Sequence, residues 1–233
     1  MSHKTVLRLA AAVSGISGVV ILVGIFYPII SYNTTYSQNY SKLISPITEK
    51  SSTETKVAEV DYTQASNWFT GGAKKEDFVS SKVEYYNITI PKLKIDRAPV
   101  AIGGEDLSES IIQYPGTAVP GKRGNAVLFG HSILPIFYNP KNVISIFSLL
   151  PTLKKGDEIE VDYDGVTYKY KVETMFEVHP TDIQVLDQDD TDSFLTLVTC
   201  VPPGDPTKPK RLIVRARVIP PEEMSYENTN KEF

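Results

Sequence analysis

The sequence predicts an all-β domain, a closed and mostly antiparallel barrel with short helices, preceded by one membrane-spanning helix and a flexible tether. Three observations lead to this fold class. The 233 residues include sixteen prolines, fourteen glycines and thirteen tyrosines, a composition typical of a β-rich body with many turns. A charge-free run lies near the N-terminus, and short stretches of alternating polar and apolar residues recur from residue 83 onward.

The N-terminal run, residues 9–30, contains no charged residue. As a helix rising about 1.5 Å per residue it would be roughly 33 Å long, which matches a hydrocarbon core about 30 Å thick. Lys4 and Arg8 precede the run, and Tyr27 stands near its far end. The positive-inside rule therefore places residues 1–8 in the cytoplasm and the rest of the chain outside the cell. A cleaved signal peptide is the alternative, but its apolar region would be shorter, about 7–15 residues.

Residues 31–82 are rich in Ser, Thr, Asn, Lys and Glu, a composition that predicts a solvated extracellular tether. A flexible chain of that length spans roughly 40 Å on average, which would hold a domain near the membrane. The only tryptophan, Trp68, lies in this stretch within "NWFTGG". We expect a local hydrophobic staple or a poorly ordered segment there, and the alternative is a flap over an active site. Residues 220–233 form a polar C-terminal tail.

The β domain is expected over residues 83–219. Its clearest element is a hairpin, because apolar residues alternate with polar ones on both sides of Asp164-Gly165, which supplies a two-residue turn. Other predicted strands are short apolar or alternating runs, over 83–91, 126–129, 193–200 and 211–219. The net charge of −4 and the pI near 5.5 argue against a nucleic-acid partner.

Cys200 is the only cysteine, and it stands where the strand 193–200 ends. Because it cannot form an internal disulfide, it is either a small buried hydrophobe or a nucleophile. A nucleophilic thiol must ionise, so it needs a base or a positive charge nearby. His3 lies on the cytoplasmic side, and His179 precedes a proline in a polar loop. His131 directly follows an apolar strand, where side chains of neighbouring strands converge, although a histidine there is more often structural than catalytic.

The strand 211–219 carries three arginines on one face, because alternate residues of a strand point the same way. We interpret Arg215 and Arg217 as lining a solvated strand face. Arg211 opens the strand that follows the cysteine loop and could return to the same end of the sheet as Cys200. There it would supply a fixed positive charge for a tetrahedral oxyanion, an effect often worth about 10²–10³ in rate.

Three segments, "LFGH", "TLVTC" and "KRLIVRA", resemble the signature segments of the sortases, the cysteine transpeptidases of prokaryotic cell envelopes. The resemblance covers residues 83–219 and is supported by "ITIPKLKIDRAPV" and "LKKGDEIEV". It implies the eight-stranded sortase barrel, with Cys200 as the nucleophile and His131 as its acid/base partner. It also implies that Arg211 positions the substrate and stabilises the oxyanion, and that Thr199 helps to shape the oxyanion site.

The same resemblance implies a membrane-anchored enzyme that cleaves a C-terminal sorting motif of secreted proteins through a thioester. The acyl group would pass to an amine of a cell-wall peptide or of a pilin lysine. A housekeeping or class D/E-like sortase is favoured over a pilin-polymerising one, because Asn67-Trp68-Phe69 lacks the Asp-Pro of a pilin-sortase lid and the C-terminal tail is polar. The alternatives are another extracellular cysteine enzyme, and a non-catalytic anchored β domain that binds an envelope partner and merely buries Cys200.

The acidic run "LDQDDTD", residues 186–192, precedes the cysteine strand. Some sortases bind calcium through carboxylates of this loop, which makes four residues weak candidate ligands: Asp187, Asp189, Asp190 and Asp192. The spacing does not match an EF-hand loop, since no glycine holds the sixth position and no glutamate the twelfth. We therefore expect a solvated acidic loop and no cofactor, with calcium as the alternative.

Overall fold

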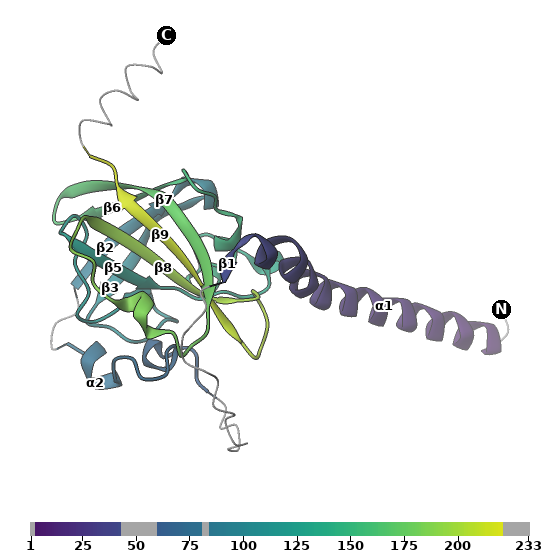
Figure 1. The fold of residues 1–233 in the computed structure, drawn as a ribbon. Helices are drawn as coiled ribbons and strands as arrows, with labels where there is room; N and C mark the ends of the chain where they lie inside the picture. Colours follow the sequence, from purple (N-terminus) through teal and green to yellow (C-terminus); the bar gives the residue numbers. More distant parts are fainter. Residues whose placement is uncertain (1–2, 43–59, 81–83, 221–233) are drawn as a thin grey trace, which may run out of the picture.

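The strands form one sheet that closes into a barrel (Figure 1), seen in a computed structural model that describes residues 3–42, 60–80 and 84–220. The eight barrel strands are β2 (Glu84–Ile90), β3 (Ile95–Ile102), β4 (Ile111–Gln113), β5 (Gly124–Phe129), β6 (Glu158–Tyr163), β7 (Val166–Val178), β8 (Ser193–Val201) and β9 (Lys210–Val218). Their order is β7-β6-β2-β3-β4-β5-β8-β9, and β9 pairs with β7 again. The closed eight-stranded barrel is thus confirmed.

The predicted hairpin is formed by β6 and β7, which pair in antiparallel fashion up to Tyr163 and Val166. Asp164 and Gly165 both have positive φ angles, 50° and 74°, as a tight turn between twisted strands requires. Most neighbouring barrel strands are antiparallel, but β3 pairs with β4 and β5 pairs with β8 in parallel.

The alternating side chains of β5, β8 and β9 enter two different hydrophobic clusters, because successive residues of a strand point to opposite faces. The first cluster fills the barrel interior and takes from these strands Ala126, Leu128, Leu195, Leu197, Leu212 and Val214. The second lies on the outer face of the same strands and takes Val127, Phe129, Val198, Cys200 and Ile213. The lone cysteine therefore lies on the outer face of the barrel.

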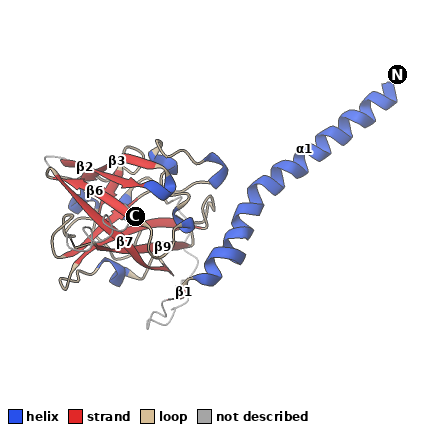
Figure 2. Cartoon of the chain, turned by 90° about the horizontal axis from the view of Figure 1, so that it is seen from above, coloured by secondary structure: helices blue, strands red, loops and turns tan. Residues whose placement is uncertain are grey.

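One long helix, α1 (His3–Ser31), precedes the barrel and projects away from it (Figures 1 and 2). It contains the whole charge-free run and none of its residues is buried in the protein. By length and composition it is able to cross a membrane.

Two parts of the segment predicted as a solvated tether pack on the barrel, which corrects that expectation for them. Tyr32 and Ser37 are buried, and the short strand β1 (Ser41–Lys42) pairs in parallel with β7. Farther along, residues 60–80 lie against the outer face of the barrel and bury Trp68 completely. The average composition conceals these contacts because a few aromatic side chains suffice to dock a short polar stretch. The rest of the predicted tether, 43–59, and the tail after residue 220 lie outside the described residues.

Candidate active site

The cysteine and the strand-end histidine lie at the same end of two neighbouring parallel strands. β5 and β8 pair in register, with Phe129 opposite Val198. His131 and Cys200 each follow two residues later, so both continue the outer face of the sheet from that pair. The sequence separates the two residues widely, and the parallel pairing brings them together.

Hydrogen bonds hold these two strand ends in place. The Gly130 amide donates to the Val198 carbonyl oxygen at 3.1 Å, and the Thr199 hydroxyl donates to the Gly130 carbonyl oxygen at 2.8 Å. The Ser132 hydroxyl donates to the Cys200 carbonyl oxygen at 2.6 Å. The Thr199 side chain therefore binds strand to strand beside the histidine, and its part in an oxyanion site stays a prediction.

Arg211 stands directly across from Cys200 in the antiparallel pairing of β8 with β9. It is buried, and backbone carbonyl oxygens fix its guanidinium. Nη1 donates to Lys208 at 2.9 Å and to Lys210 at 3.2 Å, while Nε donates to Trp68 at 3.1 Å. The structure thus brings the three residues singled out from the sequence to one end of the barrel.

Residues 60–80, here called the covering segment, close this end from solvent. The Trp68 ring stacks on Phe129 with centroids 5.2 Å apart and an interplanar angle of 12°, and lies 6.0 Å from the His131 ring. Its indole Nε1 donates to the Tyr62 carbonyl oxygen at 2.9 Å. Cys200 belongs to the same hydrophobic cluster and is only 1% exposed. The thiol is therefore shielded in this conformation.

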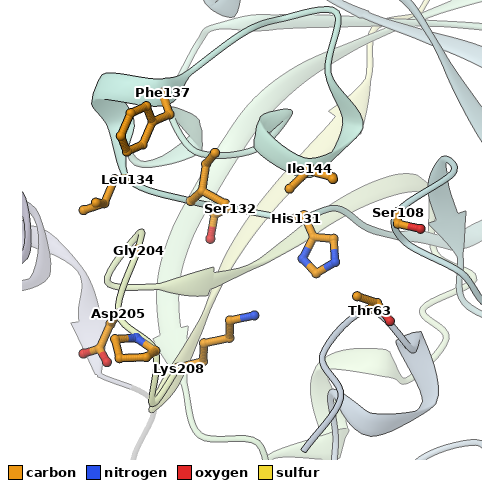
Figure 3. Close-up of a pocket in the computed structure, with 12 residues that line it drawn as sticks. Thr63, Ser108, His131, Ser132, Leu134, Phe137, Ile144, Gly204, Asp205 and Lys208 are labelled. Carbon is orange, nitrogen blue, oxygen red and sulfur yellow. The ribbon is translucent and has the colours of Figure 1, made fainter.

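Beside the shielded thiol, His131 lines a cavity of about 460 Å³ (Figure 3). Lys208 lies on its wall and extends toward the imidazole, while Phe137 and Leu134 form the far side. A second cavity, of about 950 Å³, shares Thr63, His131, Pro206 and Lys208 with the first. Together they provide a hollow of mixed polarity that ends at the histidine.

Burial determines the protonation of the pair. It raises the pKa of the Cys200 thiol, although the charges of Arg211 and Lys208 act to lower it. Burial, and then the charge of Lys208, lowers the pKa of His131 to about 4, against the opposing effects of Asp106 and Asp61. Near neutral pH both side chains are uncharged in this closed arrangement.

The acidic loop is paired with arginines of β9. Asp189 lies 3.8 Å from Nη2 of Arg215, and Asp192 lies 3.6 Å from Nη1 of Arg217. Both guanidinium groups also lie over the Phe194 ring, at 4.5 and 5.1 Å from its centre. Among the described residues, no group of three or more His, Cys, Asp or Glu side chains is placed to hold a metal ion.

Sequence reasoning missed two contributors to this region and ranked a third too low. Lys208 is the second cation beside the thiol, and it lies three residues before Arg211, just ahead of the signature strand. Ser132 directly follows the histidine and binds the cysteine backbone. Trp68 was expected to form a local staple or to lie in a poorly ordered segment, with a flap over an active site as the alternative, and it is the alternative that describes its position; the Trp-Phe pair in an otherwise polar stretch is the signal that favoured it.

A barrel that gathers a cysteine, a histidine and an arginine at one end has the groups of a cysteine acyltransferase. A family model described as the sortase domain matches residues 88–219. Sortase A of Streptococcus agalactiae serotype III (strain NEM316) is 26% identical over 183 residues, which are 75% of this chain and 70% of that protein. The chain belongs to the sortase family, whose members are cysteine transpeptidases.

Solved structures agree with this assignment. Sortase C-1 of Actinomyces oris is 30% identical with a TM-score of 0.51, and the match covers 58% of this chain and 73% of that chain. Sortase D5 of Clostridium perfringens is 27% identical with a TM-score of 0.50, and the match covers 63% and 93% of the two chains. The similar proteins thus carry the names of classes A, C and D.

Proposed function

We propose that this sortase cleaves a sorting motif near the C-terminus of secreted proteins and transfers the new acyl group to an amine of the cell envelope. The Cys200 thiolate attacks the scissile carbonyl carbon, and the C–N bond of the peptide then breaks. The His131 imidazolium gives its proton to the departing amine, which leaves a thioester on the sulfur. The acceptor amine attacks that thioester, the C–S bond breaks, and His131 takes up the proton that the amine loses.

The observation that supports this proposal most directly is the shared strand end of Cys200, His131 and Arg211 on the outer face of the barrel. Arg211 cannot lose its charge, and its guanidinium is held by three carbonyl oxygens. One of these, the Trp68 oxygen, belongs to the covering segment, so departure of that segment frees a donor. A freed Nε–H beside the sulfur is suited to bind the oxyanion of the tetrahedral intermediate.

The closed site implies that the covering segment moves before a peptide reaches the sulfur. In the closed arrangement the thiol is buried and neutral, and the imidazole pKa is depressed to about 4. Entry of water or substrate would reduce the desolvation that causes both shifts and so favour the thiolate–imidazolium pair.

The position of the enzyme in the cell follows from α1. We propose that α1 anchors the chain in the cell membrane as a single-pass type II protein, with the barrel outside the cell. The charge-free run within α1 is long enough for a bilayer, and Lys4 and Arg8 stand on its N-terminal side. Its protein partners are then secreted proteins with a sorting motif, and an amine acceptor at the cell surface.

A housekeeping or class D/E-like role remains the favoured subclass, because Asn67-Trp68-Phe69 lacks the Asp-Pro of a pilin-sortase lid. One observation favours the second candidate, a pilin-polymerising sortase. The covering segment closes the site with Trp68, as the lid of a pilin sortase would, although no Asp-Pro precedes that tryptophan.

We propose that the reaction needs no cofactor. Two carboxylates of the acidic loop, Asp189 and Asp192, already have Arg215 and Arg217 as cationic neighbours. An equal transfer rate in calcium and in a chelator is the expected result, and activation by calcium would restore Asp187, Asp189, Asp190 and Asp192 as candidate ligands.

The experiment that tests the reaction incubates the full chain in detergent micelles with a library of peptides and follows Cys200 by mass spectrometry. The expected product is an acyl adduct on Cys200 that hydroxylamine removes and that Cys200→Ala does not form. His131→Ala and Arg211→Lys should form it far more slowly, whereas His179→Ala, which removes an exposed imidazole after the end of β7, should match the parent. Failure of every peptide to acylate the thiol would leave the non-catalytic binding domain as the better description.

A further inference from the structure

The loop that follows His131 exposes two adjacent large apolar side chains. Ile136 and Phe137 lie in the turn Pro135–Phe137 and are 64% and 62% exposed. Single exposed apolar residues are common on protein surfaces, but two neighbours at the tip of one loop form a surface that water solvates poorly. They are among the most exposed large apolar side chains on the described part of the barrel.

This loop lies beside the outer end of α1. A cavity of about 270 Å³ separates the two and is lined by Tyr27, Pro28 and Ser31 on the helix, and by Pro135 and Ile136 on the loop. The charge-free run of the helix ends just before Ser31. The loop tip is therefore level with the part of α1 that would pass from hydrocarbon into the headgroup region, where amphipathic and aromatic side chains gather.

A buried carboxylate fixes this arrangement. Glu177 on β7 accepts hydrogen bonds from the Tyr32 hydroxyl at 2.6 Å and from the Ser37 hydroxyl at 3.0 Å, and pairs with Lys210 of β9 at 2.7 Å. These four residues are called the Glu177 clamp. Because it joins the residues directly after α1 to the barrel wall, it restricts the swing of the barrel about the end of the helix.

We propose that the tip of the loop, residues 135–137, rests in the outer headgroup region of the bilayer, so that the barrel contacts the lipid surface directly. The inference rests on the membrane anchor proposed for α1. Phe137 also lines the cavity that contains His131 (Figure 3), so one side of that cavity begins at the membrane surface. A polypeptide still held in the membrane would meet the cavity without first diffusing away from the lipid.

The test uses the full chain, because Cys200 is its only cysteine and Cys200→Ala provides a cysteine-free background. Ile136→Cys and Phe137→Cys are labelled with an environment-sensitive fluorophore and reconstituted into phosphatidylcholine vesicles. Val166→Cys, exposed in the β6–β7 turn, is the matched control. Fluorescence is compared between ordinary lipid and lipid with brominated acyl chains, which quench only a probe that reaches the bilayer.

We expect quenching and a blue-shifted emission at positions 136 and 137, and neither change at 166. Adding Lys210→Met, which breaks the Glu177 clamp, should reduce the quenching at position 137. If the chain floats with the vesicles but the 137 probe behaves like the 166 probe, the lipid contact is wrong and the anchor stands. If the chain does not float with the vesicles, the anchor and the contact both fail.

Discussion

The guanidinium carbon of Arg211 lies 5.6 Å from the centre of the Trp68 ring, and Nε of the same arginine donates to the Trp68 carbonyl oxygen at 3.1 Å. One residue thus belongs to the strand across from the thiol, and the other to the covering segment. Because the contact combines a cation over an aromatic face with a backbone hydrogen bond, it couples the position of the covering segment to the charge at the site.

Replacing Trp68 with alanine should expose the thiol. The substitution removes the ring that packs among His131, Phe129 and Arg211, and leaves the barrel interior unchanged. We expect iodoacetamide to alkylate Cys200 faster at pH 7.5 than in the parent, and mass spectrometry measures the rate. Tyr85→Ala, which removes an exposed aromatic side chain from β2, serves as the control. Equal alkylation rates in the parent and in Trp68→Ala would show that the covering segment does not limit access.

The depressed pKa of His131 predicts a loss of stability in mild acid. In the unfolded chain an imidazole titrates near 6.5, whereas the folded value is about 4. Between these values the unfolded state binds more protons, so the free energy of unfolding falls as the pH drops from about 6.5 to 4, by up to roughly 3 kcal/mol. Urea titrations of the parent and of His131→Asn at several pH values measure this. The slope of the free energy of unfolding against pH should differ between the two proteins only from about pH 4 to 6.5. Identical slopes in that range would refute the depressed pKa.

Burial is the largest cause of both pKa shifts at the site, and Lys208 should contribute to the pKa of each reacting group. Its charge lowers the pKa of the thiol and of the imidazole, so Lys208→Met should raise both. The imidazole pKa is read from an NMR titration, and the thiol pKa from the pH dependence of alkylation. Lys141→Met, at an exposed position of the loop after β5, is the matched control. A change in only one of the two pKa values would mean that the charge of Lys208 acts on one of the groups and not on both.

The Glu177 clamp predicts an order of stabilities. Lys210→Met leaves a buried carboxylate without its counter-charge and should lower the free energy of unfolding by about 3–5 kcal/mol. Tyr32→Phe removes one hydrogen bond to that carboxylate and should cost about 1.5–3 kcal/mol. Lys92→Met breaks the surface pair with Asp157 and should cost about 0–1 kcal/mol. Urea unfolding of the full chain in micelles gives the three values, and a Lys210→Met as mild as Lys92→Met would contradict the clamp.

Local patterns were sufficient to predict much of the barrel. The β6–β7 hairpin was predictable because the turn Asp164-Gly165 and the alternation around it are contiguous in the chain. The candidate site was predictable because Cys200, His131 and Arg211 each stand at the end of a recognisable strand. Their meeting depends on the parallel pairing of β5 with β8, which no local pattern encodes. Their positions at strand ends indicated only that they could converge, and the family resemblance implied that they act together.

The packed parts of the presumed tether were not predictable from composition. Trp68 and Tyr32 are large side chains in otherwise polar stretches, and their partners lie far along the chain on the barrel wall. Glu177 looks like an ordinary polar residue in the alternating pattern of β7, since its burial becomes visible only when Tyr32 and Ser37 dock on it. Averaging over a window hides such long-range contacts.

The pairing of β5 with β8 tolerates neither an insertion nor a deletion within β8. Adding or removing one residue within β8 would move every later side chain to the opposite face of the sheet. The sulfur would then point into the barrel and Thr199 would point to the outer face. Length changes in this enzyme are therefore expected in its connecting loops, whereas the spacing between Phe194 and Cys200 should be inherited unaltered.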